Sequence, residues 1–187
     1  MMDVMGPLLV ILGIIALVVV YVIVQYNGLV RVRNRIENGW AQIDVQLKRR
    51  YDLIPNLVET VKGYAAHERG TLEAVIAARN SAMSAKGEAS KAQAENALSG
   101  TLKSLFALGE AYPDLKANQN FLQLQEEITG TEDKIAYSRQ YFNDEVRAYN
   151  TKIQSFPSNV LAKQFKFAQR EYFQTDEADR GPVSVKF

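Results

Sequence analysis

The most apolar part of the chain lies at its N-terminus. From Val4 to Val24 the sequence contains no charged residue, and from Leu8 onward this segment is almost wholly aliphatic. About 20 helical residues, each rising about 1.5 Å, cross a hydrocarbon core of about 30 Å. The pattern therefore predicts a transmembrane helix whose span ends at Leu8 and Val24. A cleaved signal peptide is the alternative, but no basic residue precedes the run and no small-residue cleavage pattern follows it.

Beyond this segment, apolar residues recur every three or four positions, as they do on one face of an α-helix. Pro55 interrupts the pattern, and a proline removes a backbone donor and clashes with the preceding turn. Either a kink or a new helix capped by Asp52 would result. Because the apolar face continues in phase past Pro55, we favour the kink. The apolar positions are Leu29, Val32, Ile36, Trp40, Ile43, Leu47, Tyr51, Ile54, Val58, Val61 and Ala65.

Turn-forming residues divide the rest of the chain into further helical segments. We expect one helix at about Glu68 to Met83, then a connection at Lys86-Gly87-Glu88 and an alanine-rich helix from Ala89 to Leu108. Gly109 and Tyr112-Pro113-Asp114 should end that helix, and Asn118 should cap the next one. Large apolar residues then recur at intervals of seven, which predicts coiled-coil-like packing. These residues are Phe121, Ile128, Ile135, Phe142, Tyr149 and Phe156.

The C-terminal part follows two different patterns. Pro157 should stop the heptad helix, and Ser158 should cap a short amphipathic helix after it. In the last residues, Val183, Val185 and Phe187 alternate with polar side chains, as in an extended chain. We expect an extended strap packed on the helices, in preference to a strand that pairs with another protein's sheet edge.

Together these patterns predict an all-α protein. An N-terminal transmembrane anchor, residues 1–26, precedes an elongated antiparallel helical bundle with long coiled-coil-like helices and an extended C-terminal tail, residues 27–187. Basic residues after the span should keep the larger part in the cytosol, since positive flanks stay inside. We therefore expect a single-pass protein of the inner (cytoplasmic) membrane, with its N-terminus outside and the lipid bilayer as a partner. The topology-setting residues are Arg31, Arg33 and Arg35.

Composition excludes several kinds of chemistry. The 22 basic and 21 acidic residues are nearly balanced, which argues against nucleic acid as a partner. The absence of cysteine excludes disulfides, thiolate nucleophiles and thiolate metal sites. The single histidine, His67, lacks the second histidine that a zinc-protease motif or a di-iron bundle needs, so we interpret it as a surface or helix-end residue. We expect no catalytic residue, no metal and no cofactor.

Several motifs together resemble those of the LemA family, and the match covers nearly all of the chain. The resemblance implies a membrane-anchored antiparallel helical bundle with most of the chain in the cytosol, and it implies no reaction. Some relatives are similar to proteins needed for magnetosome membrane formation, which hints at membrane shaping or scaffolding. The motifs are Tyr26-Asn27-Gly28-Leu29-Val30, Trp40 to Arg50, Asp52-Leu53-Ile54-Pro55-Asn56-Leu57-Val58, Ala77-Ala78-Arg79, Pro113 to Ala117, Asn120-Phe121, Leu124-Gln125, Tyr149-Asn150, Phe156-Pro157 and Pro182 to Phe187.

Four residues of the most family-like stretch form a candidate partner surface: Trp40, Asp44, Arg49 and Asn56. The alternative is that Trp40 is core, that Asp44 pairs with Lys48 at helical spacing, and that the others are solvated. We expect a non-enzymatic scaffold that forms a homo-oligomer, is linked to membrane organisation or remodelling, and contacts other membrane proteins. The alternative function is an accessory protein or hydrolase with a small pocket of carboxylates and tyrosines in the bundle.

Overall fold

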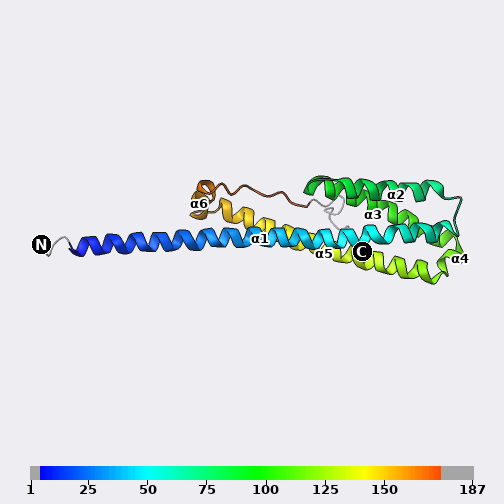
Figure 1. Cartoon of the computed structure of the whole chain (residues 1–187), viewed down its shortest axis with the longest axis horizontal. Helices are drawn as coiled ribbons and strands as arrows, with labels where there is room; N and C mark the ends of the chain where they lie inside the picture. Colours follow the sequence, from blue (N-terminus) through cyan, green and yellow to red (C-terminus); the bar gives the residue numbers. More distant parts are fainter. Residues whose placement is uncertain (1–4, 174–187) are drawn as a thin grey trace, which may run out of the picture. The chain divides into compact units, whose positions relative to one another are not determined.

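The computed structural model describes residues 5–173, and every regular element in that range is a helix. This confirms the all-α prediction, including one long apolar N-terminal helix. The predicted strap at Val183, Val185 and Phe187 lies outside the described residues. The helices are α1 (Met5–Lys62), α2 (Arg69–Ser84), α3 (Glu88–Ala111), α4 (Pro113–Lys116), α5 (Gln119–Gln154) and α6 (Ser158–Gln164) (Figure 1).

Helix α1 continues through Pro55 without a new start. The apolar face predicted from sequence is the face that α1 buries, because core residues repeat along it at helical spacing. Each of these side chains is at most 5% exposed, so the periodicity that defines the helix also defines its packing. They are Leu29, Ile36, Ile43, Leu47, Ile54, Val58 and Val61.

Helix α5 begins where the sequence predicted. The side-chain Oδ1 of Asn118 accepts a hydrogen bond from the Phe121 backbone N–H at 2.9 Å, which satisfies one of the free donors of the first turn. Five of the six heptad residues are buried. The sixth, Phe156, is 83% exposed, so its predicted place in the core is wrong. The reason is that α5 ends at Gln154, before the repeat is complete.

The predicted capping role of Ser158 is also wrong. Pro157 occupies the N-cap position of α6 and no side chain caps the helix. The Ser158 hydroxyl lies 2.6 Å from the carbonyl oxygen of Lys152 and 2.9 Å from that of Ser155. It therefore donates to carbonyls just at and after the end of α5, where acceptors outnumber donors, and the Ser155 carbonyl also accepts the Asn159 backbone N–H at 2.8 Å.

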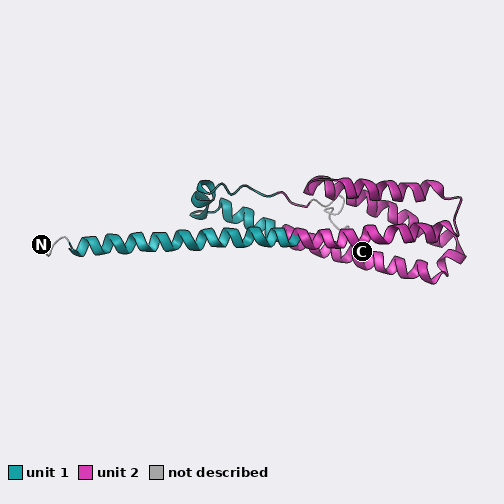
Figure 2. Ribbon diagram, in the orientation of Figure 1, with its two compact units in different colours: residues 1–39, 144–170 teal, residues 40–143, 171–187 magenta. Residues whose placement is uncertain are grey.

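The chain divides into two compact units (Figure 2). Unit 1 comprises Met1–Gly39 and Asp144–Arg170, so it holds the first part of α1, the end of α5, and α6. Unit 2 comprises Trp40–Asn143 and Glu171–Phe187. In unit 2 the remainder of α1, α2, α3 and the first part of α5 form a helical bundle, in which α2 packs directly on α3.

Candidate functional site

The predicted membrane anchor is the first part of α1. The aliphatic side chains from Leu8 to Val24 are nearly all exposed, and α1 is long and apolar enough to cross a bilayer. A continuous exposed apolar surface of this length is unfavourable in water, because each aliphatic side chain gains about 1.5–3 kcal/mol on burial. The helix is therefore compatible with a single-pass membrane protein.

The basic residues that follow the apolar run have different surroundings within unit 1. Arg31 donates from Nε to the carbonyl oxygen of Asn27 at 3.3 Å. The guanidinium of Arg33 lies over the Phe167 ring, 5.7 Å from its centroid. Arg35 lies 3.9 Å from a carboxylate oxygen of Glu145 and remains largely exposed. Arg31 and Arg35 are exposed, whereas Arg33 is half-buried and its Nε is buried without a hydrogen-bond partner among the described residues.

Trp40, the first residue of the candidate partner surface, is half-buried. Its ring lies between Phe142 and Phe173, with centroid distances of 5.6 Å and 5.8 Å. Asp44 is exposed one turn further on, and Lys48 pairs with Asp52 at 3.2 Å rather than with Asp44. Asp44 and Asp52 are each four residues from Lys48, and Lys48 pairs with Asp52, on its C-terminal side.

Arg49 and Asn56 complete the predicted partner surface. Arg49 lies 3.8 Å from the carboxylate of Glu127 on α5, and Asn56 is exposed. With 100° between successive helical residues, these two share one side of α1, whereas Trp40 and Asp44 share the other. The four residues therefore lie on two faces of α1 and not on one.

A buried ion pair, not identified from the sequence, joins the helices of unit 2. Arg50 of α1 and Glu95 of α3 are both fully buried, and an Arg50 Nη2 hydrogen bond links them. The other Glu95 oxygen accepts the Tyr51 hydroxyl. Arg50 Nη1 donates to the Ser99 hydroxyl at 2.9 Å and lies 3.7 Å from Glu132 of α5. The pair thus connects three helices through charge-assisted hydrogen bonds.

Two more cations surround this pair. Lys91 donates to the carbonyl oxygen of Ala82 at 2.9 Å and lies over the Tyr51 ring, 5.3 Å from its centroid. The guanidinium of Arg139 lies 4.5 Å from the centroid of the Phe173 ring. Aromatic faces therefore compensate part of the desolvation that burial imposes on these cations.

Burial changes the acid–base behaviour of the cluster. The pKa of Tyr51 is raised well above its ordinary value, mainly by desolvation and then by its hydrogen bond to Glu95. The pKa of Arg139 is lowered, mainly by desolvation and then by the nearby charge of Arg50. Because Arg50 and Glu95 have no exposed surface, a substrate reaches neither without opening the bundle. The arrangement is suited to fixing helix register and not to proton transfer.

A sequence signal for this ion pair exists. Arg50 lies three residues after Leu47 and four before Ile54, at a core position of the α1 face. Glu95 occupies the same kind of position three residues before Leu98 in α3. Opposite charges at core positions of two helices indicate a buried pair, because an unpaired buried charge is strongly unfavourable.

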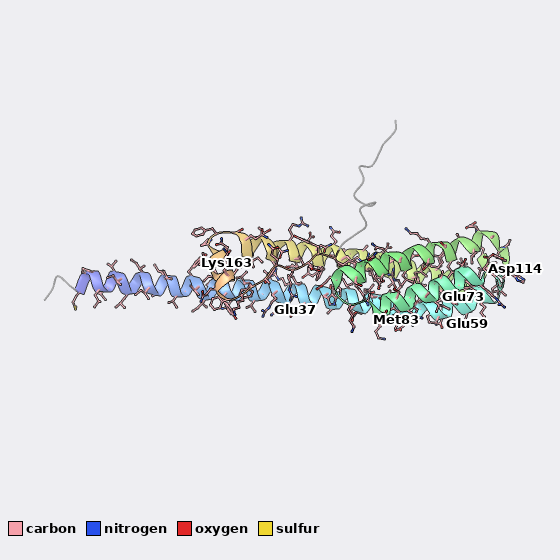
Figure 3. All side chains as sticks on the ribbon, turned by 90° about the horizontal axis from the view of Figure 1, so that it is seen from above. Glu37, Glu59, Glu73, Met83, Asp114 and Lys163 are labelled. Atoms are coloured by element: carbon pink, nitrogen blue, oxygen red, sulfur yellow. The ribbon has the colours of Figure 1, made fainter. Side chains whose placement is uncertain are left out.

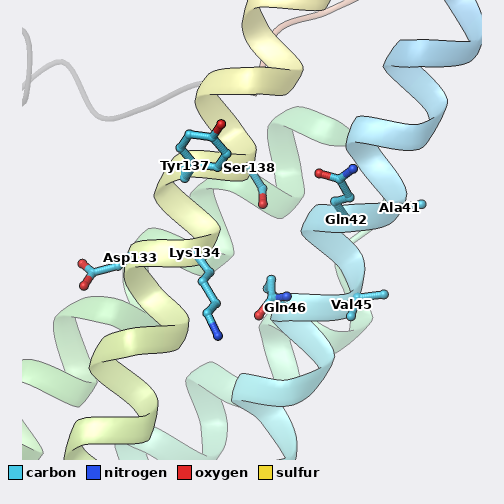
Figure 4. Close-up of a pocket in the computed structure, with 8 residues that line it drawn as sticks. All are labelled: Ala41, Gln42, Val45, Gln46, Asp133, Lys134, Tyr137 and Ser138. Carbon is cyan, nitrogen blue, oxygen red and sulfur yellow. The ribbon is translucent and has the colours of Figure 1, made fainter.

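An open groove of about 630 Å³ runs between α1 and α5 in unit 2 (Figure 4). Val45 and Tyr137 on its walls are 64% and 73% exposed. Asp133 and Lys134 bring one charge of each sign to it. One carboxylate, one amine and one phenol without a buried environment do not form an acid–base pair. Among residues 5–173, no group of three or more metal-ligating side chains is suited to hold an ion.

Comparisons with known proteins identify related sequences. The LemA family model matches residues 39–187. The chain is 29% identical to Protein LemA of Metamycoplasma hominis, over 85% of this chain and 73% of that protein. It is 25% identical to magnetosome protein MamQ of Magnetospirillum gryphiswaldense, over 95% of this chain and 76% of that one. None of these names is that of an enzyme. Since the family model matches most of its length, the chain belongs to the LemA family.

Proposed function

We propose that this protein is a non-enzymatic scaffold anchored in the bacterial inner membrane by α1. The observation that carries the proposal is the exposed aliphatic run from Leu8 to Val24, which is part of the same helix as the core-forming positions further on. The basic flank at Arg31, Arg33 and Arg35 supports an orientation with the N-terminus outside and the larger part in the cytoplasm. The magnetosome relatives support a role in organising or remodelling membranes.

Self-association is the second part of the proposal. The groove between α1 and α5 exposes Val45 and Tyr137, and it carries Asp133 and Lys134 side by side. A two-fold interface places the same patch on both partners, so neighbouring charges of opposite sign can pair across the axis. We infer that a second copy of this chain packs on the groove.

Membrane fractionation tests the anchor. The full chain should remain in the membrane pellet after alkaline carbonate extraction. A C-terminal reporter that works only in the cytoplasm should be active. A control variant with Ile14→Glu and Leu17→Glu should move toward the soluble fraction, because each buried carboxylate in a span is strongly unfavourable. Recovery of the unaltered chain in the carbonate supernatant would overturn the proposal.

Mass measurement in detergent tests self-association. Light scattering at micromolar concentration should give a defined oligomer, which Val45→Glu combined with Tyr137→Glu should reduce to the monomer. Met83→Glu is the matched control, since Met83 is half-exposed on α2 and does not line the groove. A monomeric unaltered protein, or equal dissociation by the control, would contradict the inferred interface.

A further inference from the structure

Three large apolar side chains at and around α6 are exposed. Phe156 is 83% exposed, Val160 is 59% exposed and Phe165 is 47% exposed. They lie on the turn before α6, on α6 itself and just after it, so they form a contiguous stretch of unit 1. Scattered single apolar residues on a surface are ordinary, but several exposed large ones this close together along the chain indicate an interaction site.

The stretch is held next to the end of the apolar run of α1. The Tyr26 ring packs edge-on against Phe165 and Phe167, with centroid distances of 4.9 Å and 5.8 Å. Tyr26 lies two residues beyond Val24, which is about 3 Å along the helix axis. If α1 spans the membrane, the α6 stretch is therefore at the depth of the headgroups, where tyrosine itself is favoured.

Basic residues outnumber acidic ones in unit 1, although three of them form ion pairs there: Arg35 with Glu145, Arg147 with Asp144 and Arg170 with Glu37. Residues 4–36 and 146–170 contain no aspartate or glutamate, although the whole chain is balanced at 22 basic and 21 acidic residues. The remainder of the chain is therefore acidic on balance. Lys163 lies on α6 (Figure 3). The basic residues of the two segments are Arg31, Arg33, Arg35, Arg147, Lys152, Lys163, Lys166 and Arg170.

We propose that the α6 stretch is a second membrane contact, which inserts Phe156, Val160 and Phe165 shallowly into the same leaflet and binds anionic phospholipid headgroups through its basic residues. The inference rests on the proposed anchoring by α1. Amphipathic segments with apolar and basic residues lie in the interface in this way. Each basic residue near an anionic surface contributes about 1 kcal/mol.

A lipid surface fits this stretch better than a second copy of the chain does. In a two-fold pairing the same patch faces itself, so Lys163 and Lys166 of one copy would repel those of the other. Anionic headgroups supply the missing negative charge, and the acyl boundary below them accepts the apolar side chains. A span alone leaves unit 1 free to rotate about the helix axis, whereas a second contact fixes which side of unit 1 faces the bilayer.

The absence of cysteine in the chain permits a direct test. Val160→Cys in the full-length protein is labelled with an environment-sensitive fluorophore and reconstituted into phosphatidylcholine vesicles with or without phosphatidylglycerol. We expect a blue-shifted emission, quenched by spin-labelled lipid, that becomes at least twofold stronger with phosphatidylglycerol. Lys163→Glu combined with Lys166→Glu should abolish that increase. Met83→Cys, half-exposed in unit 2, is the control and should stay in water in both vesicles.

Each alternative outcome is distinct. A water-exposed label at position 160 in a chain that resists carbonate extraction overturns the second contact and leaves the anchor intact. Loss of the chain from the vesicles in carbonate overturns the anchor. Equal quenching in the two kinds of vesicle overturns the preference for anionic lipid. Shielding that grows with the protein-to-lipid ratio identifies a second copy as the occupant and also overturns the inference.

Discussion

Separating Arg50 from Glu95 should destabilise unit 2 more than any surface change. Both side chains are fully buried, so Glu95→Leu leaves the Arg50 charge in the core with Ser99 and Glu132 as its remaining polar partners among the described residues. Breaking one side of a buried pair costs about 3–5 kcal/mol, because the remaining charge is desolvated without compensation. Tyr51 also loses its acceptor, which adds about 1–3 kcal/mol. We expect a loss of about 4 kcal/mol or more for this single change.

A double-mutant cycle separates this effect from lost packing. Arg50→Met alone should cost a similar amount, since it strands the Glu95 carboxylate. Arg50→Met combined with Glu95→Leu should cost far less than the two single changes together, because an apolar pair of similar volume is often neutral or stabilising. The coupling free energy between the two sites should therefore be about 3 kcal/mol or more.

The assay is urea unfolding of the full chain in detergent micelles, followed by the fluorescence of Trp40. That residue is the single tryptophan and packs between Phe142 and Phe173 in the same unit. Lys48→Ala is the matched control, because it breaks an exposed ion pair to Asp52 worth less than about 1 kcal/mol. Additive single and double changes, or a Glu95→Leu variant as stable as the control, would refute the reasoning.

Three further predictions concern the same unit. Phe173→Ala should lower the unfolding free energy by about 3–5 kcal/mol and shift Trp40 emission to the red, because Phe173 is fully buried beside that ring; an unchanged spectrum would contradict the observed packing. The free energy of unfolding should fall as pH rises above about 10, because Tyr51 ionises in the unfolded chain while its raised pKa keeps it protonated in the folded state. Tyr51→Phe should reduce this pH dependence, which unfolding measured at several pH values would show. Asn118→Ala should cost about 1 kcal/mol by urea unfolding through loss of the α5 cap, whereas Asn118→Ser should restore most of it.

The features that the sequence predicted well are those that a single helix determines. The burial of Ile43, Leu47 and Ile54 follows from spacing along α1, and the start of α5 follows from one local hydrogen bond of Asn118. Neither depends on which other helix is adjacent. The continuity of α1 through Pro55 is also consistent with a local rule, since the apolar face keeps its phase on both sides.

The features that sequence analysis missed depend on tertiary partners. The core position of Arg50 is visible in the sequence, but only the packing of α3 on α1 selects Glu95 as its partner. The exposure of Phe156 has a related cause. Apolar residues at intervals of seven lie on one face of a helix, but the interval does not specify what covers that face. Phe156 lies past the end of α5 at Gln154, so the helical repeat and the heptad argument no longer apply to it.

Although the charge of the whole chain is balanced, the basic residues have different surroundings in the two units. In unit 2, cations such as Arg50 and Arg139 are enclosed and compensated by carboxylates and aromatic rings, so they are not available to a partner. In unit 1, Lys163 and Lys166 have no acidic neighbour in the sequence and lie next to exposed apolar side chains. A net charge near zero therefore does not exclude a charged partner, because binding depends on how the charged residues are distributed over the surface. The apolar side chains between the basic residues favour a bilayer over nucleic acid as that partner. A nucleic acid backbone has no apolar layer to receive Val160 and Phe156, whereas a bilayer has one directly below its charged surface.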